Sequence, residues 1–222
     1  MARPVGGYKN AEGKRVPGVT TIIGRFKDSG GLMFWACEQG KAIERGEIDK
    51  LYDKRDEAAE AGTLAHEMVE KHIAGELISD LDFSLYPPEV AKQALQGYDN
   101  YLRWADTTKM EIVEQETPLV SEKYQFGGCL DAIMVNGQLA LGDWKTSNAV
   151  YPDHIIQLAA YWKLWEENNP DRPITGGFHL CRFAKEHADF AHHFWANLDD
   201  AWEQFKLFRV AYDIDKKLKK RV

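Results

Sequence analysis

The sequence predicts an α/β fold in which a mixed central β-sheet is flanked by α-helices. Segments with helical patterns come first, followed by three strand-like segments, one helix, two more strand-like segments and a closing helix. This order is typical of helices packed around a sheet. Asn136-Gly137 lies between two apolar segments and is a strong hairpin signal. With 44% hydrophobic residues, a chain of 222 residues can fill a core without metal or disulfide support.

The first half of the chain is predicted to be mainly helical, after a turn-rich start in which residues 10–13 turn a short hairpin. Apolar residues recur at helical spacing in three segments, which predict helices over residues 31–45, 56–74 and 89–104. In the first of these helices, the side chains expected to be buried are Leu32, Trp35, Ala36 and Ile43.

Residues 80–88 are predicted to be an exposed linker that ends at Pro87-Pro88, a signal for the start of a helix. The second half is predicted to carry strands over residues 112–120, 126–135, 138–145, 177–183 and 189–195. An amphipathic helix is expected over residues 152–167, and a closing helix over residues 199–219 faces the core with Trp202, Phe205, Phe208 and Tyr212.

We expect one domain over residues 1–222. Its parts are a helical region over about residues 1–110, a sheet core over about residues 111–195, and the closing helix over about residues 199–219. The three cysteines lie far apart in the sequence and form no CxxC pair, so a cluster held by four cysteines is excluded within this chain. The sequence has no apolar run of the roughly 20 residues that span a bilayer and no apolar signal segment, so we expect a cytoplasmic protein without membrane contact.

The hairpin over residues 126–147 carries the most informative polar residues. Side chains alternate along a strand, so Asp143 and Lys145 share one face. A two-residue turn would pair Asp131 with Gly142 and leave Asp143 on the opposite face. We therefore predict a three-residue loop or a one-residue bulge, which places Asp131 beside Asp143. Adjacent carboxylates favour a divalent cation between them. The alternative is that they are edge carboxylates bridged to a surface lysine.

Two pairs of polar residues lie four apart in predicted helices and therefore share a helix face. In the first pair, His66 could bind a divalent cation, and Glu70 could orient the imidazole or a bound water. In the second pair, Gln157 and Tyr161 could position a phosphate or the strand that carries Asp143. Taken alone, each pair is also compatible with a structural role: a solvated histidine, or a core tyrosine with a hydrogen-bonded amide.

The ordered set of these motifs resembles the RecB-type branch of the PD-(D/E)XK nucleases, including phage exonucleases. The motifs that carry the resemblance are Gly62-x-x-x-His66-x-x-x-Glu70, Gly128-x-x-Asp131, Asp143-x-Lys145-Thr146 and Gln157-x-x-x-Tyr161. The segments over residues 16–23 and 32–36 are similar to the N-terminal part of phage exonucleases and of the mitochondrial genome maintenance exonuclease. The resemblance implies a restriction-endonuclease-like core.

The resemblance also implies a site for Mg²⁺ or Mn²⁺ and no iron–sulfur cluster. Its expected ligands are the side chains of His66, Asp131 and Asp143 and the backbone carbonyl of Trp144. Gly127 and Gly128 match the glycine that lets the backbone approach the site in this family.

The lysine of the family's Asp-x-Lys motif corresponds to Lys145, which would assist the attack of water on the scissile phosphate. Glu116 matches a position that is often acidic in the family. We give it a secondary role, because Glu114 is expected on the same face of the strand. The catalytic residues that follow from the motifs are Lys145, Asp143, Asp131, Gln157, Tyr161 and Glu70.

We therefore expect a metal-dependent DNA exonuclease that acts in phage or prophage recombination, repair or DNA processing. The alternatives are a structure-specific endonuclease of the same fold and a non-catalytic module that binds DNA ends. The expected partners are single-stranded or duplex DNA ends and a recombination or helicase protein, because the chain lacks a phosphate-binding loop for unwinding. If the chain is phage-encoded, it would act in the cytoplasm of a bacterial host.

The net charge of −7 argues against a general nucleic-acid coat protein but allows local contact with DNA. The residues expected to grip DNA are Lys14, Arg15, Arg25 and Lys27. The basic run over residues 216–221 either contacts phosphates or complements the dipole at the end of a helix.

Overall fold

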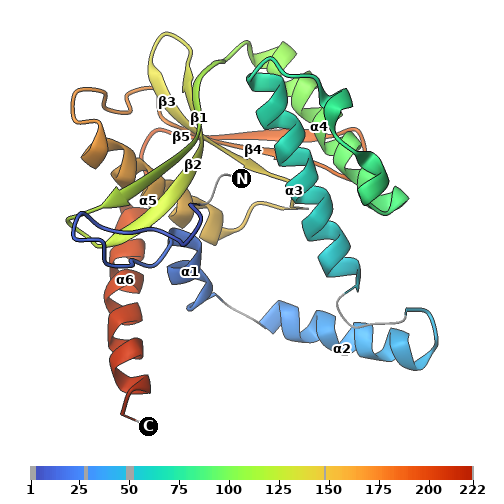
Figure 1. Ribbon diagram of the computed structural model, residues 1–222, viewed down its shortest axis with the longest axis horizontal. Helices are drawn as coiled ribbons and strands as arrows, with labels where there is room; N and C mark the ends of the chain where they lie inside the picture. The colour runs from blue at the N-terminus through green and yellow to red at the C-terminus, as the bar shows by residue number, and fades with distance from the viewer. Residues whose placement is uncertain (1–3, 28–29, 49–52, 148, 222) are drawn as a thin grey trace.

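The computed structural model describes residues 4–27, 30–48, 53–147 and 149–221. A five-stranded sheet in the order β1-β2-β3-β4-β5 forms its centre (Figure 1). Neighbouring strands are antiparallel except β3 and β4, which are parallel. The strands are β1 (Glu111–Ser121), β2 (Phe126–Val135), β3 (Leu139–Lys145), β4 (Phe178–Phe183) and β5 (Phe190–Trp195).

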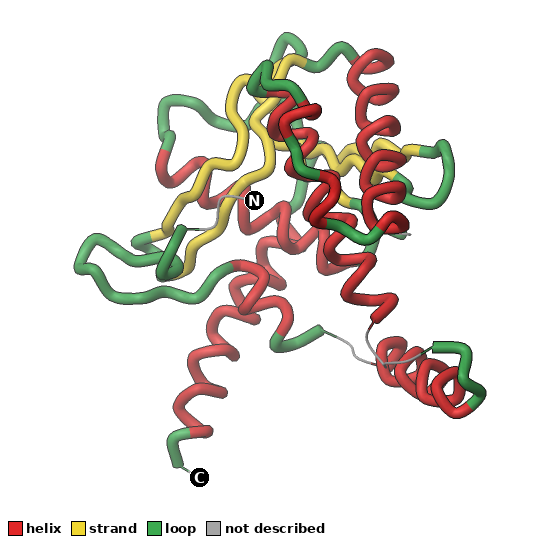
Figure 2. Tube along the Cα trace, turned by 45° about the vertical axis from the view of Figure 1, so that its right-hand side comes forward, coloured by secondary structure: helices red, strands yellow, loops and turns green. Residues whose placement is uncertain are grey.

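Helices cover both faces of this mixed sheet, so the predicted α/β class is confirmed (Figures 1 and 2). The α-helices are α1 (Val19–Gly24), α2 (Gly30–Glu44), α3 (Asp53–Ile73), α4 (Pro88–Thr108), α5 (Pro152–Asn168) and α6 (Asp199–Lys219). The bounds of α2 to α6 agree with the five predicted helices to within about one turn, whereas α1 was not predicted. No helix among the described residues is both long enough and apolar enough to cross a membrane.

Two hydrophobic cores lie on opposite sides of the sheet. The first core joins the sheet to α1, α5 and α6, and its fully buried side chains include Ile22, Phe126, Leu141, Leu164 and Phe205. The second core joins the sheet to α3 and α4, and includes Leu64, Met68, Trp104, Trp144 and Phe183. The closing helix α6 faces the first core with the four aromatic residues that its spacing predicted.

The turn between β2 and β3 confirms the register predicted for the hairpin. Val135 pairs with Leu139, so the loop holds the three residues between them, among them Gly137 with φ +76°. Ala132 in turn pairs with Gly142, which continues the register to Asp131 and Asp143. The loop length therefore brings these two carboxylates to neighbouring positions on adjacent strands.

The first half departs from prediction in two details. The segment over residues 80–88 is largely exposed, as predicted, but it contains short 3₁₀ turns, and Leu81, Phe83 and Tyr86 pack against the second core. On α2, Ile43 is exposed to 37% although it was expected to be buried. The reason is that α2 lies apart from the sheet (Figures 1 and 2). The side chain of Leu32 lies outside the described residues.

The N-terminal segment packs against β2 at Gly127, next to the strand residues that carry the polar groups. The N–H of Gly127 donates to the carbonyl of Pro17 at 3.0 Å. A Cβ added to Gly127 would lie 2.3 Å from Cγ of Tyr8, closer than atoms can approach. Only glycine therefore lets the Tyr8 ring lie on this strand.

We expect Gly127→Ala to lower the free energy of unfolding by about 1–3 kcal/mol, because the added methyl group must displace a rigid, buried ring. Urea denaturation monitored by tryptophan fluorescence measures the change. The matched control is Gly24→Ala, since a Cβ at Gly24 meets no atom within 4 Å. In a Tyr8→Ala background the penalty should largely vanish, and an undiminished penalty there would contradict the steric explanation.

Candidate functional site

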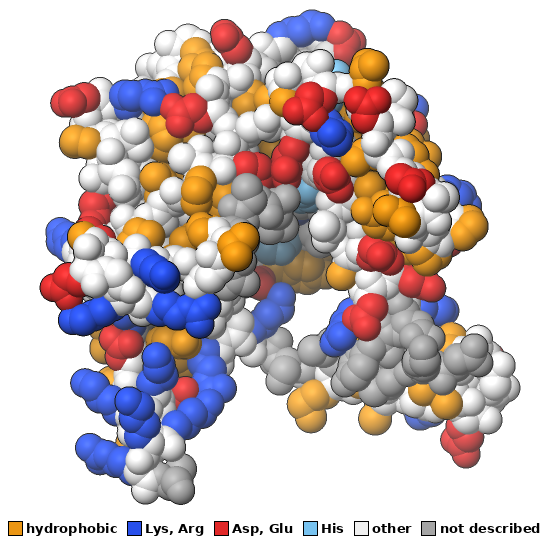
Figure 3. All heavy atoms as spheres, in the orientation of Figure 1, with side chains coloured by type: hydrophobic (Ala, Val, Ile, Leu, Met, Phe, Trp, Pro, Cys, Tyr) orange, Lys and Arg blue, Asp and Glu red, His pale blue; other side chains and the backbone are white. Residues whose placement is uncertain are grey.

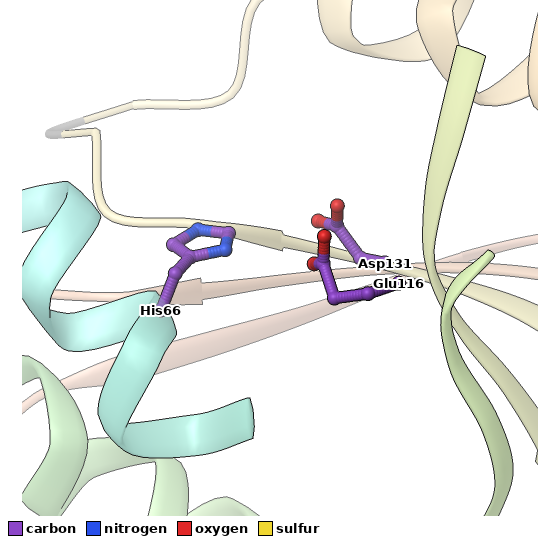
Figure 4. Close-up of side chains that lie close together, drawn as sticks. All are labelled: His66, Glu116 and Asp131. Atoms are coloured by element: carbon purple, nitrogen blue, oxygen red, sulfur yellow. The ribbon is translucent and has the colours of Figure 1, made fainter. Parts of the chain in front are cut away.

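Three side chains from three different elements converge at one end of the sheet. His66 comes from α3, Glu116 from β1 and Asp131 from β2, and their potential ligand atoms all lie within 4.8 Å of one another. Figure 4 shows the imidazole facing the two carboxylates. Figure 3 shows acidic side chains gathered around a hollow that holds histidine atoms in the middle of this side of the molecule. One nitrogen and two carboxylate donors form a ligand set suited to a divalent cation.

Helix α3 can bring His66 to the sheet because Gly62 lies one turn earlier. A Cβ at Gly62 would be 2.8 Å from Oγ1 of Thr146, the residue that follows β3. The missing side chain therefore lets the helix touch the end of the strand that carries Asp143 and Lys145. Gly62 therefore permits the contact between α3 and the end of β3 that places His66 at the site.

Glu116 reaches the site through an unusual backbone conformation. Its φ of +46° lies in the left-handed region, which a residue with a Cβ adopts only at a cost of the order of 1 kcal/mol. The register places it between the pairs Gln115–Ala132 and Thr117–Leu130, and hence opposite Asp131. Glu114 instead forms an ion pair with Arg172. Glu116 is therefore the acidic residue of β1 that lies with His66 and Asp131, although only a secondary role was expected for it from the sequence.

The imidazole of His66 has the protonation state and the available nitrogen that a metal ligand needs. Burial lowers its pKa to about 4, and the nearby Lys145 ammonium acts in the same direction. The ring is therefore neutral near pH 7 and offers a lone pair. Its buried Nδ1 has no hydrogen-bond partner within the described parts of the chain, which fits a nitrogen that awaits a cation.

Asp131 and Asp143 are buried side by side, with exposed fractions of 6% and 0%. Oδ2 of Asp131 accepts a hydrogen bond of 2.8 Å from the backbone N–H of Trp144. Asp143 forms an ion pair with Lys145 on the same strand, and no other donor of the described residues reaches its oxygens. Asp131, Asp143 and Lys145, which the sequence predicted to lie together, therefore form one cluster.

Burial shifts the ionisation of all three groups. It raises the pKa of Asp131, and it raises the pKa of Asp143 to about 6 against the opposing effect of Lys145. For Lys145, burial lowers the pKa, but the Asp143 and Asp131 carboxylates outweigh it and the net pKa is raised. The raised pKa values of the two aspartates show that a second buried negative charge is unfavourable here, whereas the Lys145 side chain stays protonated near neutral pH.

Helix α5 covers this cluster with the Gln-x-x-x-Tyr pair. Nε2 of Gln157 donates to the hydroxyl of Tyr161 at 2.7 Å. The Tyr161 ring lies on Gly128, where a Cβ would come within 2.7 Å of Cε1. Burial and the carboxylates of Asp131 and Asp143 raise the pKa of Tyr161 well above its usual value, so the hydroxyl stays protonated. Because Gly127 and Gly128 have no side chains, the rings of Tyr8 and Tyr161 can lie directly against β2.

Two other predicted residues lie beside the triad without joining it. Glu70 is one turn after His66, and its charge acts on both His66 and Asp131. The Trp144 side chain is buried in the second core. The catalytic role of Glu70 and the ligand role of the Trp144 carbonyl remain predictions.

Sequence reasoning did not single out His154, which lies in the first turn of α5, three residues before Gln157. Its pKa is lowered by burial and by Lys145, and it also feels Asp143, so it lies at the edge of the cluster. The spacing of three residues before Gln157 was the available signal, because it places both residues on one helix face. Cys129 was also missed, and its Sγ lies 3.5 Å from Oε2 of Glu116.

The four basic residues expected to grip DNA have partners within the protein. Lys14 pairs with Glu12, Arg25 with Asp215 and Lys27 with Asp153, at N–O distances of 2.6, 2.9 and 2.7 Å. The Arg15 guanidinium donates to the carbonyl of Gly6. Lys27 lies near the site, because its partner Asp153 is in the first turn of α5 and the charge of Asp153 acts on Lys145.

No protein-family model and no curated protein matches the sequence. Among solved structures, the chain is similar to a candidate exonuclease from Eubacterium rectale, with 13% identity and a TM-score of 0.48 over 66% of this chain and 64% of that one. It is also similar to SSO0001, with 16% identity and a TM-score of 0.34 over 82% and 84% of the two chains. At such low values, neither likeness identifies a family or an activity for this chain.

We expect the triad to bind one Mn²⁺ per chain, and Glu116→Gln and His66→Ala to weaken binding at least about tenfold, because each removes a donor atom. Titration calorimetry or the loss of the free-Mn²⁺ spin-resonance signal measures the affinity. Glu114→Gln is the matched control on the same strand and should bind Mn²⁺ as the wild type does. Unchanged affinity in Glu116→Gln would mean that the triad is not the site.

Proposed function

We propose that this protein is a metal-dependent deoxyribonuclease, with exonuclease activity favoured. The observation that carries the proposal is the convergence of His66, Glu116 and Asp131 beside a buried Lys145–Asp143 ion pair. A binding module would not require three ligand groups, an ammonium and a protonated tyrosine in one buried cluster. Phosphodiester hydrolysis requires a cation, a source of fixed positive charge and an ordered water.

The proposed cofactor is Mg²⁺ or Mn²⁺, held by His66, Glu116 and Asp131. Asp143 and the backbone carbonyl of Trp144 are the further ligands that the resemblance to RecB-type nucleases adds. The side-chain oxygens of Asp143 support its inclusion as a ligand. Among the described residues they accept no hydrogen bond, and their one ionic partner is Lys145. A bound divalent cation lowers the pKa of a water and offsets charge on the phosphoryl group.

Lys145 supplies the charge that does not depend on the cation. Asp143 holds its ammonium within the cluster, and the raised pKa keeps it protonated at neutral pH. In the proposed reaction, water attacks phosphorus, the bond to the 3′ oxygen breaks, and the products carry a 5′-phosphate and a 3′-hydroxyl. Lys145 would stabilise the additional negative charge that builds up on the phosphoryl oxygens.

Tyr161, Gln157 and Glu70 are proposed as positioning residues. Tyr161 is held by its hydrogen bond to Gln157 and by contact with β2 at Gly128, so its hydroxyl keeps a fixed place beside the two aspartates. Glu70 would orient His66 or a water at the edge of the site. These roles require no change in protonation during the reaction.

Substrate and setting belong to the same proposal. We infer that DNA ends, single-stranded or duplex, are the substrate, and that the protein serves phage or prophage recombination, repair or DNA processing in a bacterial cytoplasm. A recombination or helicase protein would supply opened strands. The acidic side chains gathered around the site support a cation-dependent approach of DNA, because a bound cation would offset their repulsion of phosphates.

We expect end-labelled linear DNA to be degraded with Mg²⁺ or Mn²⁺ and closed circular DNA to stay intact. Lys145→Ala should lower the turnover number about 10²–10³-fold, as expected for loss of a group that stabilises transition-state charge. Single-stranded linear, duplex linear and circular DNA are incubated with each cation, and products are resolved on denaturing gels. The products of the wild type should carry 5′-phosphates.

Lys163→Ala is the matched control, because Lys163 also lies at the site-covering helix α5 but pairs with Glu166. It should retain wild-type turnover. Cleavage of circular DNA would favour the endonuclease alternative. Binding of DNA ends without cleavage under either cation would favour the binding module, and activity that survives both Lys145→Ala and Glu116→Gln would refute the proposed site.

A further inference from the structure

Helix α6 carries two apolar faces, and the first core accounts for only one of them. On the inner face, Trp202 and Phe205 are buried, and Phe208 and Tyr212 pack against the first core. A helix at the surface of a protein ordinarily has one apolar face and one polar face. The outer face of α6 departs from this pattern.

The outer face carries a stripe of exposed aliphatic side chains. The residues of this outer stripe and their exposed fractions are Leu207 (68%), Val210 (60%), Ile214 (51%) and Leu218 (54%). Their spacing of three, four and four residues aligns them within about 80° of the helix circumference over about 16 Å. Single exposed leucines are common, but an aligned set is typical of a contact surface.

Opposite charges stand at the two ends of the outer stripe. Glu203 lies one turn before Leu207 and Arg221 follows Leu218. Arg221 lies just beyond the last residue of α6, but Lys220 keeps a right-handed helical conformation and the Arg221 N–H donates to the Leu218 carbonyl at 2.9 Å. The two charges are 18 positions apart, about five helical turns, so they lie nearly in line with each other and with the stripe. Glu203 is exposed and contacts Lys206 at 2.7 Å. Within the described chain, Arg221 has no ion-pair partner of its own.

We propose that two copies of this protein associate through an antiparallel pairing of their α6 helices across a two-fold axis. In this register Leu207 faces the partner's Leu218, Val210 faces the partner's Ile214 and Glu203 faces the partner's Arg221. Each contact occurs twice, as a two-fold axis requires. The stripe is thus complementary to itself in both shape and charge.

A parallel pairing of the two helices is disfavoured by the same residues. It would place Glu203 beside its own copy and bring together the basic ends of both helices, which carry Lys216, Lys217, Lys219, Lys220 and Arg221. Like charges at these distances repel. The gathering of Lys and Arg side chains over the lower part of α6 is visible in Figure 3.

The pairing leaves the candidate functional site of each copy intact. The residues of that site lie on α3, β1, β2, β3 and α5, and none of them is on α6. The interface is small, because four aliphatic side chains and one charged pair from each copy form it. Interfaces of this size support an equilibrium between monomer and dimer that depends on protein concentration.

Sedimentation equilibrium of the full chain, over roughly a hundredfold range of concentration, tests the proposal. The wild type should change from monomer to dimer as the concentration rises, and Ile214→Glu should raise the dissociation constant at least about tenfold, because it buries a charge in the stripe. Leu85→Glu is the matched control, since Leu85 is an exposed aliphatic residue outside α6. A monomer at every concentration, or a dimer unaffected by Ile214→Glu, would overturn the proposal.

Charge reversal tests the antiparallel register. Glu203→Arg places two like charges together at each end of the interface, and so does Arg221→Glu, so each should raise the dissociation constant about two- to tenfold. The double variant restores opposite charges and should recover wild-type association. These positions are exposed, so folding should persist, and far-ultraviolet circular dichroism checks it. If the double variant associates more weakly than either single variant, the antiparallel register is wrong.

Discussion

The burial of Asp143 and Lys145 as an ion pair at the end of β3 is the constraint on which the site depends. Removing two charges from water is costly, and the cost is offset only if their geometry is fixed by the surrounding structure. The sheet supplies that geometry, because both residues are on one strand with β2 and β4 on either side. A second aspartate, Asp131, and Glu116 lie beside this pair, so three acidic side chains surround a single ammonium.

Close approaches at glycine make this concentration of charge possible. Gly62 lets α3 touch the end of β3, and Gly127 and Gly128 let two tyrosine rings lie on β2. Each approach removes water from the region and thereby strengthens the electrostatic interactions inside it. Glu116, whose backbone is left-handed, adds a further carboxylate to the cluster. The structure thus stores a modest backbone strain at the point where a cation would compensate the charge.

The candidate functional site and the outer stripe of α6 lie in regions of opposite charge. Acidic groups gather around the site, whereas Lys and Arg gather over the end of α6 (Figure 3). The first core links the two regions, since α5 covers the site on one side and packs against α6 on the other. Although the net charge of the protein is −7, the end of α6 is positively charged and can contact a partner copy or the phosphates of a nucleic acid. These basic residues are not on the elements that carry the cation site.

The sequence by itself determined helices α2 to α6, the five strands and the hairpin register, and it selected most of the polar residues that the fold brings together. Helical and strand periodicity are local properties, and the three-residue loop followed from the alternation of side chains together with the need to bring Asp131 next to Asp143. The choice of Glu116 over Glu114 was decided by the tertiary structure, because a left-handed glutamate on a strand is disfavoured locally and is held there by its neighbours. The packing of Leu81 and Phe83, the exposure of Ile43 and the place of His154 depend in the same way on contacts between segments far apart in the chain. Periodicity tells which side chains share a face, but only the packed fold determines what that face meets.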